Sequence, residues 1–295
     1  MKVEDVAIIG AGPTGIAAGI QLKRYGITPV IFEKDRPGGL LRNANLVENY
    51  PGFPGGISGP ELVNLFVKQL NTESLDVVFE NITDINFDKN LFIIKTPKKA
   101  YSFYTILIAS GTKPKEFSDF EIQENVKDRI FYEIYPILNE KNKNIVIAGA
   151  GDAAFDYALN LGKNNEVIIL NRGNNVKCLA LLLDNAKILP NISLHNNVNI
   201  TNIVENPQGL LSVKCVNPES AMNFDAHYLV FAIGRKPQLD FLSAGIKSNR
   251  QELENRELLF FAGDVKNGYY RQTSIAVGDG VMAAMKIYRK LKENI

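Results

Sequence analysis

Two glycine-rich turns have the residue types and spacing of a phosphate-binding site. The first reads GAGPTG at residues 10–15 and lies between a short apolar run and a helix-like run. In such a unit Gly10 permits the tight turn, Gly12 lets the backbone approach a pyrophosphate, and Gly15 lets the helix pack closely on the strand. The helix N-terminus adds free N–H groups and positive partial charge. The pattern therefore predicts a dinucleotide site at this turn.

An acidic residue follows at the expected distance. The apolar run 29–32 ends at Glu33, eighteen residues after Gly15, which completes a βαβ unit. A carboxylate at this point can accept hydrogen bonds from the hydroxyl groups of an adenosine ribose. The alternative interpretation is a glycine-rich turn that keeps the fold without a ligand.

The same arrangement recurs later in the chain. The apolar run 144–148 precedes GAGDAA at 149–154, and a helix to Leu161 and a strand at 167–170 follow. Alanine at the third position of the motif still allows close packing. The second unit is either another nucleotide site or a βαβ unit that keeps only the fold. Two dinucleotide sites in one chain indicate two redox carriers that exchange electrons.

Length and element order predict how the two units are connected. A chain of 295 residues exceeds the usual single core, so we expect two domains. Strand-like runs end near residues 112 and 234, and a last strand and the helix 273–291 come after the second of them. The sequence therefore predicts an α/β fold with a first domain at 1–112 and 235–295, interrupted by a second at 113–234.

Composition excludes several classes of function. The chain has 33 Lys and Arg against 32 Asp and Glu, so no global field attracts nucleic acid or an anionic membrane. The two cysteines, Cys178 and Cys215, exclude a disulfide framework and suit a reducing compartment, so we expect a cytoplasmic protein. No long apolar run predicts a signal peptide or membrane span. His195, in a polar loop, and His227, before a strand, form no metal or triad pattern.

Five motifs in a fixed order carry a resemblance to a known family. They are GAGPTG at 10–15, GGLL at 38–41, VENYPGFPGGISGPEL at 47–62, GAGDAA at 149–154, and AGDV with YYRQTSIAVGDG between 262 and 280. Over essentially its whole length the chain resembles the low-molecular-weight thioredoxin reductase group of FAD-containing pyridine nucleotide oxidoreductases. The resemblance implies two Rossmann-like, three-layer ββα domains, with FAD in the first, NADPH or NADH in the inserted one, and a homodimer.

The resemblance also assigns roles to single residues. It places the first glycine turn on the FAD pyrophosphate, Glu33 on the adenosine ribose, and a later group at the flavin. The implied FAD residues are Gly10, Gly12, Pro13, Thr14, Gly15, Glu33, Gly39, Leu40, Asn49, Gly111, Gly263, Asp264, Arg271 and Gln272. The implied nicotinamide nucleotide residues are Gly149, Gly151, Asp152, Ala153, Ala154, Arg172 and Lys177. Ser58 and Glu61 have the spacing of a capping box, a structural role.

The chain departs from the family where the redox chemistry is expected. Thioredoxin reductases carry a Cys-x-x-Cys pair just ahead of the second glycine turn, but residues 131–138 read FYEIYPIL. Disulfide exchange needs a thiolate and a resolving thiol, so the dithiol relay cannot run and no catalytic residue is identified. Phe131, Tyr132 and Tyr135 either shield the flavin face or domain seam, or serve in packing.

Three functional hypotheses follow from this departure. The run from FYEI to FDYALNL resembles the ferredoxin-NADP reductases built on the same scaffold, which pass electrons from NADPH through FAD to a one-electron carrier. The chain is then an NAD(P)H oxidoreductase with a ferredoxin, flavodoxin or small-molecule acceptor. Alternatively, it receives electrons from such a carrier, or binds flavin without turnover. The basic segment 286–292 is a solvated helix face or a docking site for an acidic carrier.

The nicotinamide nucleotide is less clearly specified. NADPH-dependent members carry a His-Arg-Arg-x-x-x-Arg pattern after the second strand, whose arginines grip the 2′-phosphate. The corresponding stretch here, 171–177, reads NRGNNVK, so that Arg172 is kept, Gly173 replaces an arginine, and Lys177 supplies a point charge. There is no acid of the kind that favours NADH. The sequence slightly favours NADPH, with weakened affinity.

Overall fold

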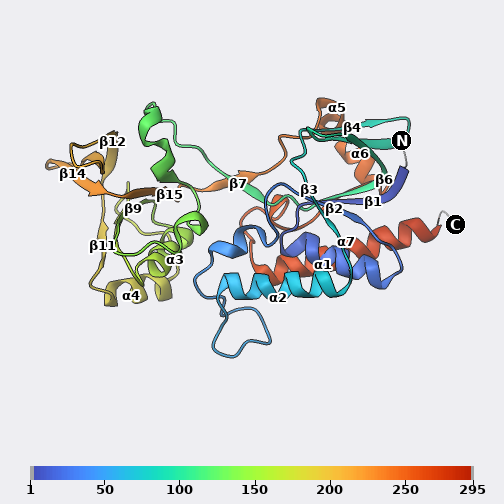
Figure 1. Ribbon diagram of the computed structural model, residues 1–295, viewed down its shortest axis with the longest axis horizontal. Helices are drawn as coiled ribbons and strands as arrows, with labels where there is room; N and C mark the ends of the chain where they lie inside the picture. Colours follow the sequence, from blue (N-terminus) through green and yellow to red (C-terminus); the bar gives the residue numbers. More distant parts are fainter. Residues whose placement is uncertain (1–2, 294–295) are drawn as a thin grey trace. The chain divides into compact units, whose positions relative to one another are not determined.

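The computed structural model describes residues 3–293, which divide into two units (Figure 1). The first contains the chain up to residue 42, residues 46–113 and the segment from residue 236; the second contains 43–45 and 114–235. The chain runs between the units along β7 (Thr112–Pro114) and β16 (Arg235–Pro237), which pair with each other. Unlike our expectation, residues 43–45 group with the second unit.

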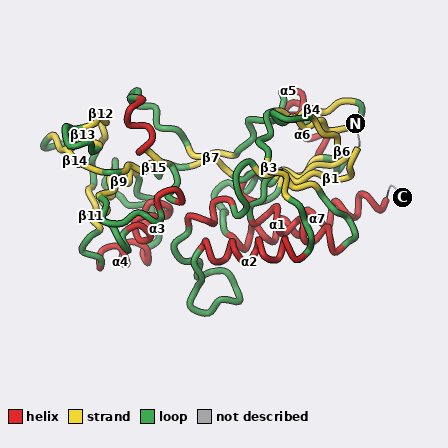
Figure 2. Tube along the Cα trace, viewed as in Figure 1, coloured by secondary structure: helices red, strands yellow, loops and turns green. Residues whose placement is uncertain are grey.

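A seven-stranded sheet forms the centre of the first unit. Its order is β3-β2-β1-β6-β5-β4, with β17 also paired to β6. The strands are β1 (Val3–Ile9), β2 (Val30–Glu33), β3 (Val77–Phe79), β4 (Asp84–Asp88), β5 (Leu91–Lys95), β6 (Ala100–Ile108) and β17 (Leu259–Phe261). The helices are α1 (Pro13–Arg24), α2 (Gly59–Thr72), α5 (Ala244–Ser248), α6 (Arg250–Asn255) and α7 (Thr273–Glu293). Figure 2 shows α1, α2 and α7 together along one side of this sheet.

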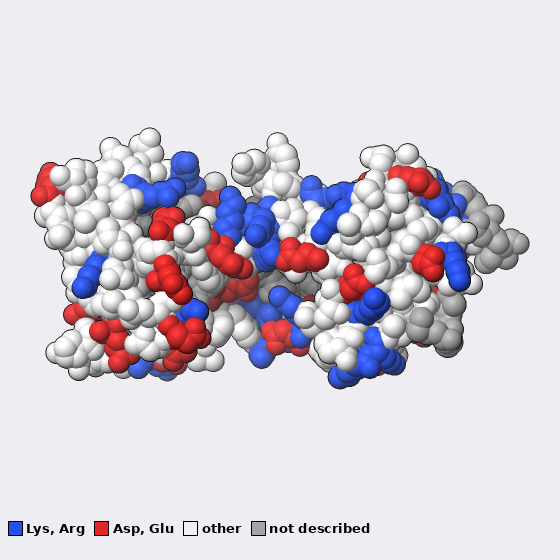
Figure 3. Space-filling model, turned by 90° about the horizontal axis from the view of Figure 1, so that it is seen from above, with Lys and Arg blue, Asp and Glu red and all other residues white. Residues whose placement is uncertain are grey.

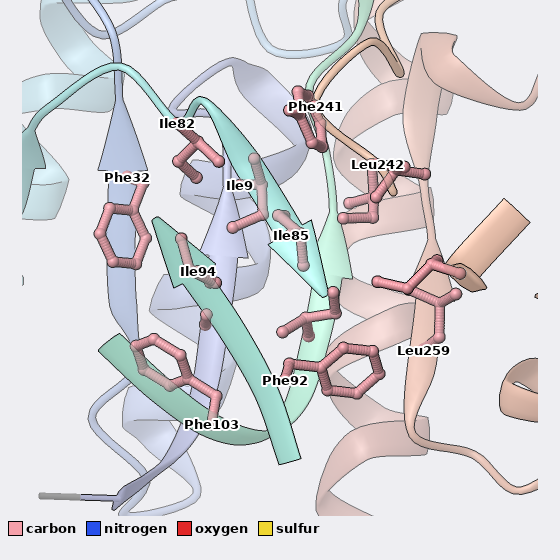
Figure 4. Packing of buried hydrophobic residues seen from close by; sticks show 14 of the residues in the cluster. Ile9, Phe32, Ile82, Ile85, Phe92, Ile94, Phe103, Phe241, Leu242 and Leu259 are labelled. Atoms are coloured by element: carbon pink, nitrogen blue, oxygen red, sulfur yellow. The ribbon is translucent and has the colours of Figure 1, made fainter. Parts of the chain in front are cut away.

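Alternation along the central strands builds a layer on each face of the sheet. In β1, Ile8 faces α1 and α7, whereas Ile9 belongs to the cluster that includes β4 and β5, because successive strand residues point to opposite faces. Figure 4 shows the second cluster, in which Phe32, Phe92 and Phe103 are completely or almost completely buried. The arrangement is the predicted three-layer fold.

The second unit repeats this plan. Its parallel sheet has the order β11-β10-β9-β15-β8, and β12, β13 and β14 form a separate antiparallel sheet. The strands are β8 (Ile130–Phe131), β9 (Asn144–Ala148), β10 (Glu166–Leu170), β11 (Ile192–His195), β12 (Asn199–Glu205), β13 (Leu211–Val216), β14 (Ala221–Ala226) and β15 (Tyr228–Phe231), and the helices are α3 (Asp152–Leu161) and α4 (Ala180–Ile188). The fold class predicted from the sequence is therefore confirmed for both units.

Two local predictions have different outcomes. Ser58 and Glu61 form the expected capping box, since the Ser58 hydroxyl accepts the Glu61 N–H and the Glu61 carboxylate accepts the Ser58 N–H. His195, expected in a loop, instead ends β11, and its ring lies edge-on to Phe224 with centroids 5.0 Å apart. No local sequence pattern predicts this ring contact, because the two residues lie in different strands.

The surface agrees with the balanced composition. On the face drawn in Figure 3, Lys and Arg are interspersed with Asp and Glu. Within residues 3–293, no helix is long and apolar enough to cross a membrane. The same residues hold no group of three or more His, Cys, Asp or Glu side chains that could bind a metal ion.

Candidate dinucleotide sites

The three glycines of the first turn lie in three different settings. Gly10 has a φ of +107°, and a Cβ there would lie 2.5 Å from the Ala109 carbonyl oxygen. A Cβ on Gly15 would lie 1.9 Å from the Gly10 oxygen, so α1 can approach the turn only without a side chain. A Cβ on Gly12 would meet nothing within 4 Å. The backbone is therefore open at the position where a pyrophosphate is expected.

Glu33 is held against the same turn. Gly10 donates its N–H to Phe32, and the Glu33 carboxylate accepts the N–H groups of Ala11 and Asp35 at 3.0 and 3.1 Å. These bonds fix the carboxylate at the end of β2, beside the glycine turn. The structure thus places Glu33 where a ribose of a bound dinucleotide is expected.

The GGLL motif returns to this turn. Gly38 donates its N–H to the Ala11 oxygen at 2.7 Å. Gly39 has a φ of +55°, and a Cβ there would lie 3.4 Å from the Gly12 Cα. Gly39 begins a 3₁₀ helix, η1 (Gly39–Asn43), which also contains half-buried Leu40. Gly39 is therefore brought together with the glycine turn.

The C-terminal segment closes the other side of the turn around Thr14, which is buried. A Cβ on Gly263 would lie 2.1 Å from the Thr14 Oγ1, and one on Gly280 would lie 2.2 Å from the Thr14 oxygen. The Gly263 N–H donates to Asp279. Asp264 lies half-buried in the short helix η4 (Gly263–Val265). Asp279 and Gly280, which our residue assignment missed, thus hold this segment in place.

Three more predicted residues form a polar group at the start of α7. Asn49 donates its side-chain amide to the Gln272 side chain at 2.9 Å, and Ser274 donates its hydroxyl to the Asn49 carbonyl. The Arg271 Nε is buried and has no hydrogen-bond partner within residues 3–293. A buried donor without an acceptor is costly and fits a site completed by a ligand. The residues present therefore fit FAD, the group implied by the resemblance; Gly111, with a φ of +63°, leaves further open space.

The second turn has the same backbone frame. Gly149 has a φ of +137°, and a Cβ there would lie 2.4 Å from the Ala232 oxygen. Ala154 is completely buried at the third motif position, whereas Asp152 and Ala153 are exposed at the start of α3. The Asp152 carboxylate accepts the Leu179 N–H at 2.8 Å. This turn therefore has the backbone geometry of a Rossmann dinucleotide turn.

The loop after β10 passes directly over this turn. Lys177 donates its N–H to the Ala150 oxygen at 2.8 Å and forms a β-bridge with Gly151. Asn171 points inward: its amide nitrogen donates to Asn196, and its oxygen accepts the Gly173 N–H. The side chains left on the exposed side include those of the predicted residues Arg172 and Lys177.

Comparison with known proteins identifies the family. The family of pyridine nucleotide-disulphide oxidoreductases matches residues 4–280. The chain belongs to this family. It is 29% identical over 310 residues to a thioredoxin reductase of Borreliella burgdorferi, covering 98% of this chain and 93% of the relative. It is also 29% identical over 315 residues to NADPH-dependent thioredoxin reductase 3 of Arabidopsis thaliana, of which it spans only 59%.

Solved structures support the fold of this pyridine nucleotide-disulphide oxidoreductase. Thioredoxin reductase from Lactococcus lactis, in the FR conformation, superposes with a TM-score of 0.85 at 24% identity, covering 98% of this chain and 99% of the other. The enzyme from T. acidophilum gives the same TM-score and identity, covering 99% and 100%. At this identity the likeness establishes the architecture alone.

In this pyridine nucleotide-disulphide oxidoreductase, packed aromatic rings occupy the segment just ahead of the second glycine turn. The Tyr132 ring contacts Phe231 with centroids 5.6 Å apart, and its oxygen accepts the Phe117 N–H at 2.9 Å. Phe131 lies edge-on to Tyr228. For Phe131 and Tyr132, these contacts within the second unit support the packing interpretation.

The two cysteines are free thiols in different settings. Cys178 is half-buried before α4, and Cys215 is buried in β13. Burial raises the pKa of Cys215 to about 11 and also raises the pKa of Cys178. Because the thiolate is the nucleophile, both groups are held in their unreactive form.

Buried Asn43 and half-buried Asp156 are two polar residues of the second unit that sequence reasoning missed. Asn43 is 2% exposed, and its side-chain oxygen accepts the N–H groups of Ile134 and Tyr135 at 3.1 and 2.8 Å. The Asp156 carboxylate accepts the Asn45 N–H at 3.1 Å, and burial raises the pKa of Asp156 to about 6. No local motif marks either residue, because their partners are distant in sequence.

Proposed function

We propose that this chain is an FAD-dependent oxidoreductase that passes electrons from NAD(P)H to an acceptor other than a disulfide. The observation that carries the proposal is the packed position of Tyr132, whose ring and phenolic oxygen are both engaged where a dithiol would lie. Family membership supports the use of a pyridine nucleotide. The missing thiols separate the chain from relatives that are named thioredoxin reductases.

The residues of the first unit support FAD as the resident cofactor. Bound FAD can accept a hydride from a nicotinamide and release electrons one or two at a time. The chain supplies the open backbone at Gly12, the carboxylate of Glu33 and the unpartnered Nε of Arg271. The first turn of α7 offers backbone N–H groups and positive partial charge, which stabilise a negative charge nearby.

The acceptor is proposed by its chemistry. Without a dithiol, electrons have to leave to a group that reacts without thiol exchange, such as a ferredoxin, a flavodoxin or a quinone-like small molecule. Among protein carriers, an acidic one is favoured by the basic C-terminal end of α7, where Lys292 is exposed. The proposal includes no nucleic-acid or membrane partner.

An anaerobic spectral titration tests the donor and the acceptor separately. NADPH or NADH at micromolar concentration is expected to bleach the oxidised flavin band of the purified protein, with dithionite as the positive control. Ferredoxin, flavodoxin or a quinone should then restore the band, whereas oxidised thioredoxin should not. Reoxidation by thioredoxin would overturn the proposed acceptor class, and failure of both nucleotides to bleach the flavin would overturn the proposed donor.

In a second candidate function, a reduced carrier protein and not NAD(P)H is the electron donor. The inward position of Asn171 and the absence of a side chain at Gly173 leave few groups to grip a nucleotide, which favours electrons arriving from a reduced carrier protein. Rapid flavin reduction by ferredoxin but not by a nicotinamide would support it. A protein that keeps FAD in stoichiometric amount but cycles with no donor and acceptor pair would be a flavin-binding protein without turnover.

We also propose a homodimer in the cytoplasm. The exposed side of α7 carries Ile275, Met282 and Met285, whose spacing of seven and three residues places them along one stripe of the helix. A second copy would cover this stripe. Sedimentation of the flavin-loaded protein should give twice the chain mass, and Met282→Lys should shift it toward a monomer; a monomeric wild type would overturn the assembly.

A further inference from the structure

The two glycine turns can be matched residue by residue through their hydrogen bonds. Gly10 donates its N–H to Phe32 at 2.8 Å, and Gly149 donates its N–H to Leu170 at 2.9 Å. The residue that follows the acceptor is Glu33 in the first unit and Asn171 in the second. Asn171 therefore occupies the position at which a Rossmann fold selects the adenosine ribose.

Asn171 cannot bind a ribose in the way that Glu33 can. Glu33 keeps its carboxylate at the turn, bonded to the Ala11 N–H. Asn171 is 6% exposed, and its amide is used inside the loop, on Asn196 and Gly173. A bound nucleotide would meet neither a carboxylate that binds a free 2′-hydroxyl nor a negative charge that repels a 2′-phosphate.

The same loop offers only modest attraction for a 2′-phosphate. Arg172 is exposed and has no hydrogen bond or ion pair within residues 3–293, and Lys177 is exposed with its backbone fixed on Ala150. Between them, Gly173 contributes no side chain. Exposed cations attract a phosphate weakly, because water and salt screen the interaction.

We propose that the second unit binds NADH and NADPH with affinities within tenfold of each other. The absence of a side chain at Gly173 is the cause of this lack of preference. The inference rests on the proposed function, because it describes the nucleotide site of the same oxidoreductase. It adds that the site does not require the 2′-phosphate of NADPH for binding and does not exclude it.

Gly173 is also the position where discrimination can be added. Its φ lies outside the left-handed region, and a Cβ there would meet nothing closer than the Asn171 side-chain oxygen at 4.0 Å. An arginine can therefore be accommodated without disturbing the loop. A guanidinium that reaches the 2′-phosphate makes charge-assisted hydrogen bonds, which NAD⁺ cannot receive.

Calorimetric titration of NAD⁺ and NADP⁺ into the flavin-loaded protein tests the inference without turnover. The wild type should give Kd values within tenfold of each other. Gly173→Arg should tighten NADP⁺ at least tenfold and leave NAD⁺ unchanged. Gln208→Arg is the matched control: it adds the same charge at the far end of the β12–β13 hairpin and should change neither Kd.

The outcomes separate this inference from the proposed function. A wild-type preference above tenfold for either nucleotide overturns the indifference but leaves a nicotinamide-driven oxidoreductase. A Gly173→Arg protein that binds flavin normally, with an unchanged ratio of Kd values, overturns the role of Gly173. If neither nucleotide binds at millimolar concentration, the proposed donor is wrong and this inference falls with it.

Discussion

The two glycine turns share a backbone frame but differ in how tightly they are enclosed. In the first unit, Thr14 is buried under Gly263 and Gly280, and α1 lies so close to the turn that Gly15 has no room for a Cβ. In the second unit, the residue equivalent to Thr14 is Ala153, which is exposed. The first turn is closed by distant chain segments. The loop after β10 crosses the second turn, but the first helical residues after it, Asp152 and Ala153, stay exposed.

This difference matches the two roles that we propose. A cofactor that stays bound benefits from a site closed by the C-terminal segment, because releasing it requires that segment to move. A nucleotide that exchanges in every cycle needs an accessible helix N-terminus, such as that of α3. The same βαβ unit can thus retain a cofactor in the first unit and exchange a nucleotide in the second. The difference depends on which chain segments cover the first residues of the helix.

Substitution of the third glycine-motif residue should give the largest difference in stability between the two turns. Gly15→Ala places a Cβ 1.9 Å from the Gly10 oxygen, so we expect a loss of about 3 kcal/mol of stability and little retained flavin. The converse change in the second unit, Ala154→Gly, removes a methyl group from a helix and should cost only about 1 kcal/mol. Flavin content after gel filtration and denaturant unfolding measure both effects.

Equal effects of these two substitutions would contradict the comparison. If Gly15→Ala kept full flavin content, α1 would have to lie farther from the turn than the structure shows. If Ala154→Gly abolished folding, the second turn would be as constrained as the first. A Gly26→Ala protein does not serve as a control, because Gly26 has a φ of +81° and an alanine at that position would be strained by its backbone conformation.

Much of both turns could be predicted from the sequence because their requirements are local. A glycine at a fixed spacing after an apolar run predicts a tight turn, and Glu33 and the Ser58 capping box follow from the same short-range patterns. The packing role of Tyr132 remained one of two alternatives, since its ring partner Phe231 lies almost a hundred residues away.

The closing contacts and the buried polar residues could not be predicted. Thr14 meets Gly280 only because α7 packs against α1, a pairing that no local periodicity reveals. Asn43 was expected to lie in the first domain, yet it is buried in the second unit, where it accepts backbone N–H groups of Ile134 and Tyr135. An asparagine among polar neighbours looks like an ordinary surface residue in the sequence.

The pH dependence that arises from Asp156 gives a further test of the difference between the two units. Asp156 is half-buried in α3, and desolvation raises its pKa to about 6, whereas the equivalent position of α1, counted from the first glycine, is Ala17. The folded state therefore binds this proton more tightly than the unfolded chain, with its usual value of 3.8. The resulting stability is fully present below about pH 4 and is lost as pH rises through about 6, by up to about 3 kcal/mol.

Comparison with Asp156→Asn isolates this contribution. The variant keeps an oxygen that can accept the Asn45 N–H but cannot ionise. It should be more stable than the wild type at pH 8, and the difference should shrink as pH falls toward 4. Denaturant unfolding at several pH values measures this; a difference that is constant with pH, or that grows in acid, would show that Asp156 is not destabilised by burial of its charge.

The smallest expected effect concerns how each unit starts its next helix. In the first unit, α2 is capped by its own Ser58 and Glu61; in the second, α4 has no side-chain cap at Leu179, whose N–H is accepted by Asp152 of the nucleotide turn. Ser58→Ala should therefore cost about 1 kcal/mol and leave the affinity for NADP⁺ unchanged. Glu61→Gln, whose amide oxygen can still accept the Ser58 N–H, should cost less than Ser58→Ala does. An equal loss in both variants would mean that the charge of Glu61 stabilises the start of α2 as much as the Ser58 hydroxyl does.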